Sequence, residues 1–317
     1  MSFSELLGNS QLKNNLQSAV AQDKLAHFYL ISGAEGSGKH TLARLLAAAM
    51  MCRETDKPCM RCAQCRKVLS GNHPDFITVD DPEKKTVPVE LIRNARAELF
   101  IRPNEGRRKV YLFPRAQDIG LPGQNALLKV LEEPPAYGVF LLLTDNPEKL
   151  LPTVRSRCTE LKLHPLEDDV LRSALEQAFP AADDETIRSA MLRGGGYLGQ
   201  AKDILAGGNR LLPQTERFAA ACAGKDRLEM LRLLCSMEKT KREPLIQILS
   251  QWRELLHDSL TCRAGLPAPS PMAQSLGTAR SARDLMRAAE EIEKVLEYAQ
   301  GNVSPAAICG YLARTLQ

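Results

Sequence analysis

A glycine-rich segment that ends in a lysine is the part of this sequence best suited to chemistry. Residues 33–39 read Gly-Ala-Glu-Gly-Ser-Gly-Lys, after an apolar run at 28–31 that predicts a strand and before a run at 41–51 that predicts a buried helix. In that setting glycines let backbone N–H groups turn toward phosphate oxygens, and the lysine reaches the terminal phosphates. The pattern predicts a phosphate-binding loop (P-loop) for ATP or ADP; the alternative is a glycine-rich turn without a ligand. Its candidate residues are Gly33, Gly36, Gly38, Lys39, His40 and Thr41.

The residue after the lysine departs from the usual P-loop. A Ser or Thr hydroxyl normally holds Mg²⁺ at this position, and here the residue is His40. Thr41 is no simple substitute, because one step along a helix turns the side chain by about 100°. A neutral imidazole is a poor ligand for a hard cation that prefers oxygen. We therefore expect the loop to bind Mg²⁺ weakly.

The second half of a magnesium site is expected at the end of a later strand, predicted at residues 109–113. Pro114 and Arg115 follow that strand, where an ATPase of this kind places Asp and Glu. Proline has no side-chain ligand and arginine cannot act as a base. Asp118 and Asp145 lie nearby, but a rescue by either needs unusual geometry. The sequence predicts a site that binds nucleotide without hydrolysing it.

Four cysteines crowd into residues 52–65, directly after the predicted P-loop helix: Cys52, Cys59, Cys62 and Cys65. Four thiolates are the ligand set of a closed, tetrahedral, structural Zn²⁺ site, so no chemistry is assigned to the metal. An iron–sulfur cluster is the main alternative, but its fourth cysteine is replaced by Leu69. Four unligated thiols are the other alternative.

The order of predicted elements defines the fold class. Strand-like runs alternate with helical runs in the first half, which predicts an α/β fold with a parallel sheet covered on both sides. After about residue 165 the pattern is helical, and Gly207, Gly208, Asn209 and Pro213 suggest a boundary. We expect an α/β P-loop domain at 1–165 with the cysteine module inserted at 52–65, a small helical domain at 166–210 and a helical C-terminal domain at 211–317.

Composition excludes little else. The chain has 317 residues, 44% hydrophobic and 25% charged, and its 42 basic and 38 acidic residues give a net charge of +4. That balance is too weak to argue for nucleic-acid binding. The N-terminal residues lack the pattern of a secretory signal, and the longest apolar run is broken by Arg44. The expected compartment is the cytoplasm, without a membrane.

The motifs in this order resemble the bacterial AAA+ clamp-loader family, the tau/gamma and delta-prime subunits of DNA polymerase III. The resemblance runs from residues 7–9 through 26–30, the P-loop, the four cysteines and the Leu-Glu-Glu-Pro-Pro segment at 131–135 to the Ser-Arg-Cys segment at 156–158. In the helical second half it extends only to architecture. Active members carry an arginine near Gly199, and its absence, with His40, Pro114 and Arg115, places the chain nearer delta-prime than tau/gamma.

The resemblance implies a role without ATP hydrolysis by this chain. In the family, the arginine that Arg157 matches is an arginine finger, which contacts the ATP of a neighbouring subunit and stabilises transition-state charge. The small helical domain is then a lid and the C-terminal domain a collar. The implied complex is a hetero-pentamer with tau/gamma and delta subunits that loads a sliding clamp on primed DNA, with this chain as its rigid, non-hydrolysing stator.

Two other functions remain open. One is an active AAA+ ATPase of the tau/gamma type. The other is a zinc-dependent nucleic-acid-binding module, favoured by basic residues beside the cysteines but lacking aromatic residues for stacking. Those basic residues are Arg53, Lys57, Arg61, Arg66 and Lys67.

Overall fold

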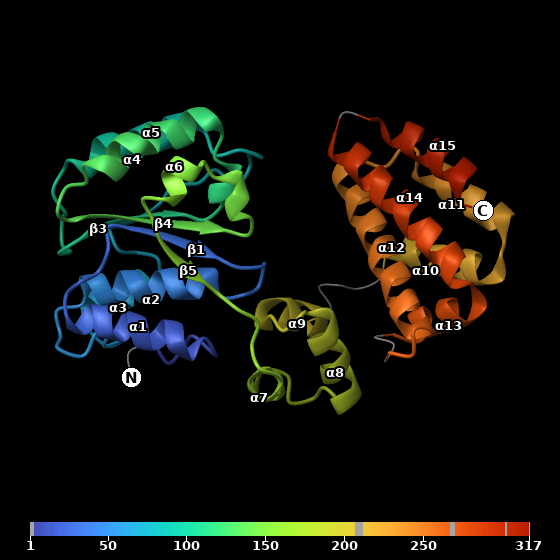
Figure 1. The fold of residues 1–317 in the computed structure, drawn as a ribbon, viewed down its shortest axis with the longest axis horizontal. Helices are drawn as coiled ribbons and strands as arrows, with labels where there is room; N and C mark the ends of the chain where they lie inside the picture. Colours follow the sequence, from blue (N-terminus) through green and yellow to red (C-terminus); the bar gives the residue numbers. More distant parts are fainter. Residues whose placement is uncertain (1–2, 207–211, 267–269, 302, 317) are drawn as a thin grey trace. The chain divides into compact units, whose positions relative to one another are not determined.

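Five parallel strands form one sheet in the order β2-β3-β4-β1-β5 (Figure 1). The computed structural model describes residues 3–206, 212–266, 270–301 and 303–316. The strands are β1 (Phe28–Ser32), β2 (Phe76–Thr78), β3 (Lys109–Phe113), β4 (Gly138–Thr144) and β5 (Thr159–Lys162). The α/β fold class with a parallel sheet, predicted from the alternation of strand and helix runs, is confirmed.

The three central strands are buried along their whole length because both faces of the sheet are covered. Successive side chains enter opposite cores. In β1, Tyr29 and Ile31 belong to one core, while Phe28 and Leu30 belong to the other. A strand buried on both sides has no polar alternation, which is why these strands read as continuous apolar runs.

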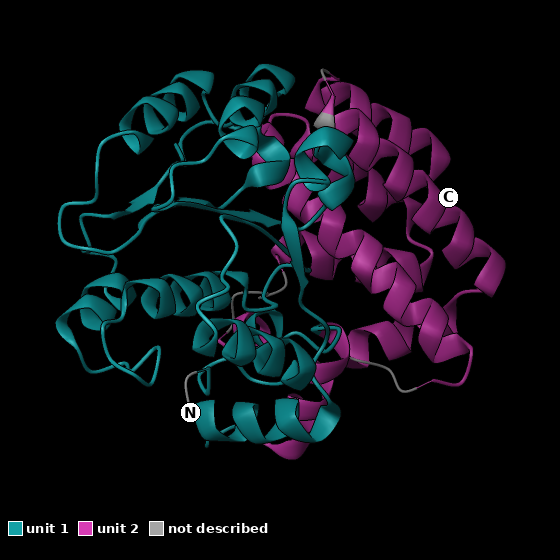
Figure 2. Cartoon of the chain, turned by 60° about the vertical axis from the view of Figure 1, so that its left-hand side comes forward, with its two compact units in different colours: residues 1–182, 194–202 teal, residues 183–193, 203–317 magenta. Residues whose placement is uncertain are grey.

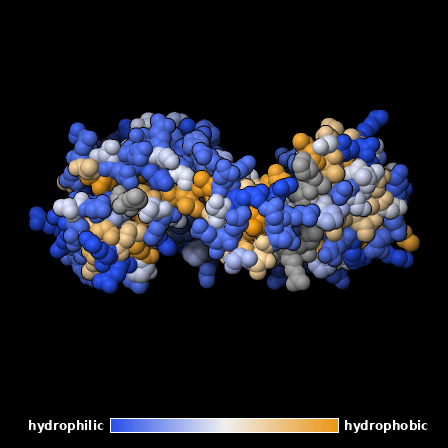
Figure 3. All heavy atoms as spheres, turned by 90° about the horizontal axis from the view of Figure 1, so that it is seen from below, coloured by the Kyte–Doolittle hydropathy of each residue, from blue (hydrophilic) through white to orange (hydrophobic). Residues whose placement is uncertain are grey.

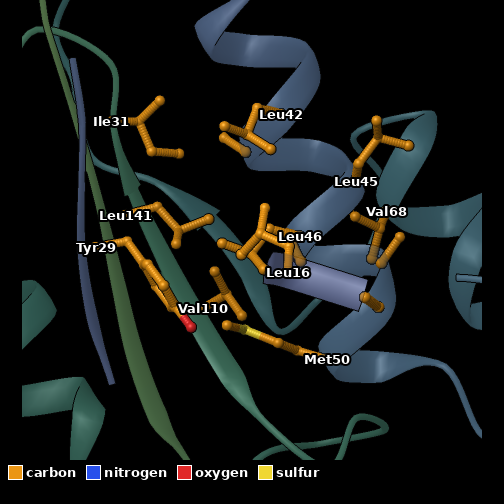
Figure 4. Close-up of a cluster of buried hydrophobic side chains, with 14 of the residues drawn as sticks. Leu16, Tyr29, Ile31, Leu42, Leu45, Leu46, Met50, Val68, Val110 and Leu141 are labelled. Carbon is orange, nitrogen blue, oxygen red and sulfur yellow. The ribbon is translucent and has the colours of Figure 1, made fainter. Parts of the chain in front are cut away.

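Helices cover both faces of the sheet (Figure 1). One face carries α1 (Ser10–Ala21), α2 (Lys39–Met51) and α3 (Ala63–Leu69), and the other carries α4 (Val89–Leu99), α5 (Leu121–Glu132) and α6 (Pro152–Arg155). In the first core Leu42 and Leu46 of α2 lie against Ile31 and Leu141 of the sheet (Figure 4). This packing fixes the start of α2, and with it the loop that joins α2 to β1.

The rest of the chain is helical. Three short helices, α7 (Asp168–Ala178), α8 (Asp184–Arg193) and α9 (Leu198–Leu205), follow the sheet. A bundle is then formed by α10 (Pro213–Gly224), α11 (Arg227–Met237), α12 (Arg242–Arg263), α13 (Pro271–Ala279), α14 (Ala282–Gln300) and α15 (Pro305–Thr315). Its buried Trp252 stacks on Phe218 with ring centroids 4.1 Å apart.

The chain divides into two compact units (Figure 2). The first comprises residues 1–182 and 194–202, and the second comprises residues 183–193 and 203–317. The expected division at 165 and 210 into three domains stays a prediction. The expected boundary at Gly207, Gly208 and Asn209 lies outside the described residues.

One strand was not expected from the sequence. β5 reads Thr-Glu-Leu-Lys and is exposed except at Leu161, because it lies at the edge of the sheet. A short, polar edge strand avoids pairing with other chains, and for the same reason it gives no apolar run to detect.

Most of the face in Figure 3 is hydrophilic, with apolar residues in small groups. Within the described ranges, every helix is too short or too polar to cross a bilayer.

Candidate functional site

The P-loop joins β1 to α2 beside the carboxyl ends of the parallel strands. Gly36 and Gly38 have φ of 73° and 94°, a left-handed region that favours glycine. The first N–H groups of α2 point toward the loop, since the helix begins at Lys39. A cavity of about 640 Å³ opens here, bounded by the loop, residues 4–7, His164 and the start of α9. Such a volume accommodates a small-molecule ligand.

Lys39 is held by its own loop. Its Nζ donates to the carbonyl oxygens of Gly33 and Ala34, both at 2.8 Å. Burial lowers the pKa of Lys39, while Asp145 and Glu35 act in the opposite direction. A phosphate would therefore compete with two backbone carbonyls for this ammonium group.

The residues next to Lys39 differ in what they offer a ligand. The Ser37 Oγ is buried and has no hydrogen-bond partner in the described part of the chain. Burial lowers the pKa of His40, and the nearby Arg44 and Lys39 lower it further. A neutral imidazole thus stands where a magnesium-binding hydroxyl is usual.

The start of α9 lies directly on the P-loop. The Gly199 N–H donates to the Gly36 carbonyl at 2.9 Å. A Cβ on Gly199 would lie 2.5 Å from the Gly36 Cα, and a Cβ on Gly36 would lie 2.5 Å from the Gln200 nitrogen. Neither position has room for a side chain in this arrangement.

The carboxylates near the end of β3 are tied to Arg115. Its Nη2 and Nε contact the two carboxylate oxygens of Asp80 at 2.7 Å and 3.2 Å. Its Nη1 lies 3.7 Å from the Asp118 Oδ2. The Asp80 hydrogen bond raises the pKa of Arg115 despite some burial. A fixed cation therefore occupies the place where an ATPase of this class needs a carboxylate.

The four cysteines converge into one cluster. Their Sγ atoms all lie within 4.8 Å of one another. Cys52 and Cys62 are 4.0 Å apart and Cys59 and Cys65 are 3.9 Å apart, close to the roughly 3.8 Å that tetrahedral zinc–sulfur bonds imply. The N–H of Cys62 donates to the Cys59 sulfur at 3.3 Å, and the N–H of Cys65 donates to the Cys62 sulfur at 3.4 Å.

The donor set fits a closed metal site. Burial opposes ionisation of Cys59, but the N–H groups of Cys62 and Arg61 lower its pKa to about 7. Burial raises the pKa of Cys65. Thiols with such different acidity become four thiolates together only when a cation binds them. Cys52 and Cys65 belong to the core beneath α2, so the cluster is part of the packing.

Arg157 lies between α6 and β5, with its side chain 38% exposed. Its Nη1 donates to the Thr153 carbonyl at 2.9 Å, and its Nη2 donates to the Glu132 Oε1 at 3.2 Å. Glu132 comes from the Leu-Glu-Glu-Pro-Pro segment, to which sequence reasoning assigned no role. These contacts pair the guanidinium with a carboxylate at the end of α5 and leave it partly exposed.

The position of Arg157 follows from the sheet topology. It stands two residues before Thr159, which pairs with Tyr29 near the amino end of β1, whereas the P-loop follows the carboxyl end of β1. A strand of this length spans roughly 16 Å. Arg157 therefore lies at the end of the sheet where the parallel strands begin, and the P-loop of the same chain lies at the end where they finish.

The structure groups the predicted residues into three places. The P-loop residues other than Gly33 line one cavity together, and the cysteines form one cluster. Arg157 is separate from both. Sequence reasoning missed the ion pair to Glu132 and the closure of Gly199 on Gly36, since only three-dimensional contacts create them.

The fold and loop define a P-loop α/β protein. A gamma-subunit-related protein of DNA polymerase III from Thermotoga maritima has a similar fold, with a TM-score of 0.51, 14% identity and coverage of 96% of this chain and 98% of that one. The family model described as DNA polymerase III, delta subunit, matches residues 8–167, just over half of the chain. The chain belongs to this family of clamp-loader subunits.

Curated relatives agree with this assignment. DNA polymerase III subunit gamma of Buchnera aphidicola is 33% identical over 64% of this chain and 57% of its own length. DNA polymerase III subunit delta′ of Bacillus subtilis is 34% identical over 50% of this chain and 49% of its own length. The chain thus spans about half the length of these two relatives.

Proposed function

We propose that this chain is the non-hydrolysing, delta-prime-type stator of a bacterial sliding-clamp loader. It presents Arg157 to ATP bound by a neighbouring tau/gamma-type subunit, and a delta-type subunit completes the ring. The assembled ring opens a sliding clamp and places it on primed DNA. The family assignment and the named relatives support the setting, and the position of Arg157 supports the role.

The observation that carries the proposal is the separation of Arg157 from the P-loop of its own chain. A guanidinium beside the amino ends of the strands cannot reach a phosphate beside their carboxyl ends. It is exposed and charged, as an arginine that acts on another subunit's nucleotide must be, and it is paired with Glu132.

The P-loop itself lacks the groups that hydrolysis requires. His40 is neutral and offers nitrogen, and Pro114 has no ligand. Arg115 occupies the strand end and binds Asp80. The loop retains its glycines and Lys39, so ATP or ADP binding without turnover is the activity we assign to this cavity.

We further propose structural zinc at Cys52, Cys59, Cys62 and Cys65, where the metal would fasten the insertion to the core beneath α2. A lid role for residues 166–210 and a collar role for residues 211–317 complete the assignment. The contact of Gly199 with the P-loop supports the lid. The separate helical core around Trp252 supports an independent C-terminal unit.

The test uses a loader reconstituted from this chain with tau/gamma-type and delta-type subunits. Removal of an arginine finger typically lowers turnover at its site by about 10³-fold or more. We expect Arg157→Ala to abolish the share of ATP turnover that depends on this chain, without disturbing assembly. The matched control is Arg155→Ala, which removes a neighbouring arginine paired with Glu148 at 2.6 Å. Equal turnover with and without Arg157 would overturn the proposal.

The isolated chain separates the proposal from its rival. We expect no ATP hydrolysis above that of a Lys39→Ala variant. Hydrolysis that depends on Lys39 would instead identify an active ATPase of the tau/gamma type.

A further inference from the structure

The helical bundle contains a cavity of about 300 Å³ that no part of the proposed function uses. It is formed by the end of α10, the starts of α11 and α14, one residue of α12 and the end of α15. Its walls are apolar over much of their area, with side chains of Ala221, Met230, Leu256, Leu285, Ala288 and Leu316. The floor therefore favours an apolar group.

The rim of the cavity is basic. Four cationic side chains line it, against two carboxylates. The Asp226 carboxylate accepts the Glu229 N–H at 2.9 Å and so caps α11. Asp284 lies in the first turn of α14. Both carboxylates stand at helix N-termini. The hydrogen bond with Ser281 lowers the pKa of Asp284, and the nearby Arg280 and Lys225 lower it further, so this carboxylate offsets part of the cationic charge. The cations still outnumber the carboxylates by two. The cations are Lys225, Arg227, Arg280 and Arg287.

One of these cations is fixed in place. The Arg280 Nε donates to the Cys222 carbonyl at 2.8 Å, and the Arg280 carbonyl accepts from Arg263 at 2.8 Å. By contrast, Arg227 and Arg287 are exposed and have no hydrogen-bonded or ion-paired acceptor in the described part of the chain. A preordered arginine beside two available ones suits an incoming carboxylate.

Two exposed apolar residues neighbour rim arginines in the sequence, although neither lines the cavity. Leu228 and Met286 directly follow or precede rim arginines, and their residues are 58% and 54% exposed.

We propose that this basic-rimmed cavity binds an acidic peptide segment of a partner protein, which inserts one bulky apolar side chain into the floor and places flanking carboxylates on the arginines. A cavity of about 300 Å³ is at the small end of ligand pockets, so it suits one anchoring side chain rather than a whole cofactor. The excess of cations over carboxylates selects acidic flanks.

The test measures fluorescence anisotropy of a labelled peptide, Gly-Asp-Glu-Phe-Asp-Glu, with the full chain. Two matched peptides accompany it: one with Ser in place of Phe, and one with Asn and Gln in place of the acidic residues. We expect saturable binding of the first, and at least about tenfold weaker binding of each of the others.

Variants of the chain assign the site. Arg227→Glu with Arg287→Glu reverses two exposed charges and leaves the core intact, and we expect at least about tenfold weaker binding. Arg283→Gln, on α14 but outside the cavity, is the matched control and should bind normally. Ala288→Phe fills the floor and should weaken the Phe peptide; circular dichroism checks that the variant is folded.

Each other outcome overturns the proposal. These are absence of binding to the native chain, equal affinity for the Ser peptide, and no effect of the charge-reversed pair. Displacement of the Phe and Ser peptides alike by inorganic phosphate would assign the rim to simple anions. Dimerisation of the chain that is lost in the charge-reversed variant would assign the cavity to a second copy. Since none of these assays requires ATP turnover, they are independent of the stator proposal.

Discussion

Gly199 lies on Gly36 so closely that a side chain on either residue would collide with the other segment. The Gly199 N–H reaches the Gly36 carbonyl at 2.9 Å, and a Cβ on Gly199 would lie 2.5 Å from the Gly36 Cα. Two glycines that are 163 positions apart thus join α9 to the P-loop. A side chain of any size at position 199 is incompatible with this arrangement.

We predict that Gly199→Ala forces α9 away from the P-loop. Backbone atoms of Gly36 form the obstacle, so no flexible side chain can move aside. Overpacking of this kind costs about 1–3 kcal/mol of unfolding free energy. Chemical denaturation monitored by circular dichroism measures the loss for the first unit.

The control for this change is Gly310→Ala. Gly310 lies within α15, and no atom lies within 4 Å of a Cβ placed there. Alanine in a helix is favoured over glycine by about 0.5–1 kcal/mol, so this variant should be slightly more stable. A Gly199→Ala chain as stable as the native one would show that α9 leaves the loop freely.

Glu132 should act on turnover through the position of Arg157. We expect Glu132→Gln to lower kcat for ATP in the reconstituted loader by about 1.4-fold to fivefold, because an exposed ion pair contributes about 0.2–1 kcal/mol. The KM for ATP should stay unchanged, and the chain should lose at most about 1 kcal/mol of unfolding free energy. Glu148→Gln, which removes the partner of Arg155, is the control. An unchanged kcat would mean that Thr153 alone orients the guanidinium.

The sequence was informative wherever function depends on local pattern. The P-loop glycines and the four cysteines lie near one another in the chain, so their spacing predicts their arrangement. The buried central strands are also predicted by the sequence, because each one is a continuous apolar run. In each case a short stretch of residues contains the whole signal.

Contacts between residues that are far apart in the chain could not be predicted from the sequence. The approach of Gly199 to Gly36, the pairing of Arg115 with Asp80 and the contact of Arg157 with Glu132 join distant segments. Glycine, arginine and carboxylate residues have too many potential partners for sequence alone to select one. β5 was missed for a different reason, since an edge strand is selected to be polar.

The cysteine cluster predicts a dependence on metal that stability measurements detect. We expect the purified chain to contain one Zn²⁺, and Cys59→Ser to lose it together with at least about 2 kcal/mol of unfolding free energy. A zinc-selective chelator should have the same effect on the native chain and none on the variant. Cys235→Ser, at an exposed thiol outside the cluster, should stay within about 0.5 kcal/mol of the native chain. Iron or no metal in the purified chain would contradict the assignment.

Asp258 on α12 predicts a dependence on pH in the second unit. Burial raises the pKa of its carboxyl from 3.8 to about 6, Glu254 adds to this, and Arg193 and His257 oppose it. The folded state therefore holds the proton more tightly than the unfolded state, so the stability that this group contributes is fully present below pH 3.8 and is lost as pH rises through about 6. Because the group is partly exposed, we expect Asp258→Asn to gain only about 1–2 kcal/mol at pH 7.5. At pH 4 the gain should be within about 0.5 kcal/mol, and Glu293→Gln, at an exposed position of α14, should give no such difference between the two pH values. Urea unfolding at both pH values measures the gain in unfolding free energy. An equal gain at pH 4 and pH 7.5 would show that loss of the Asp258 charge is not its cause.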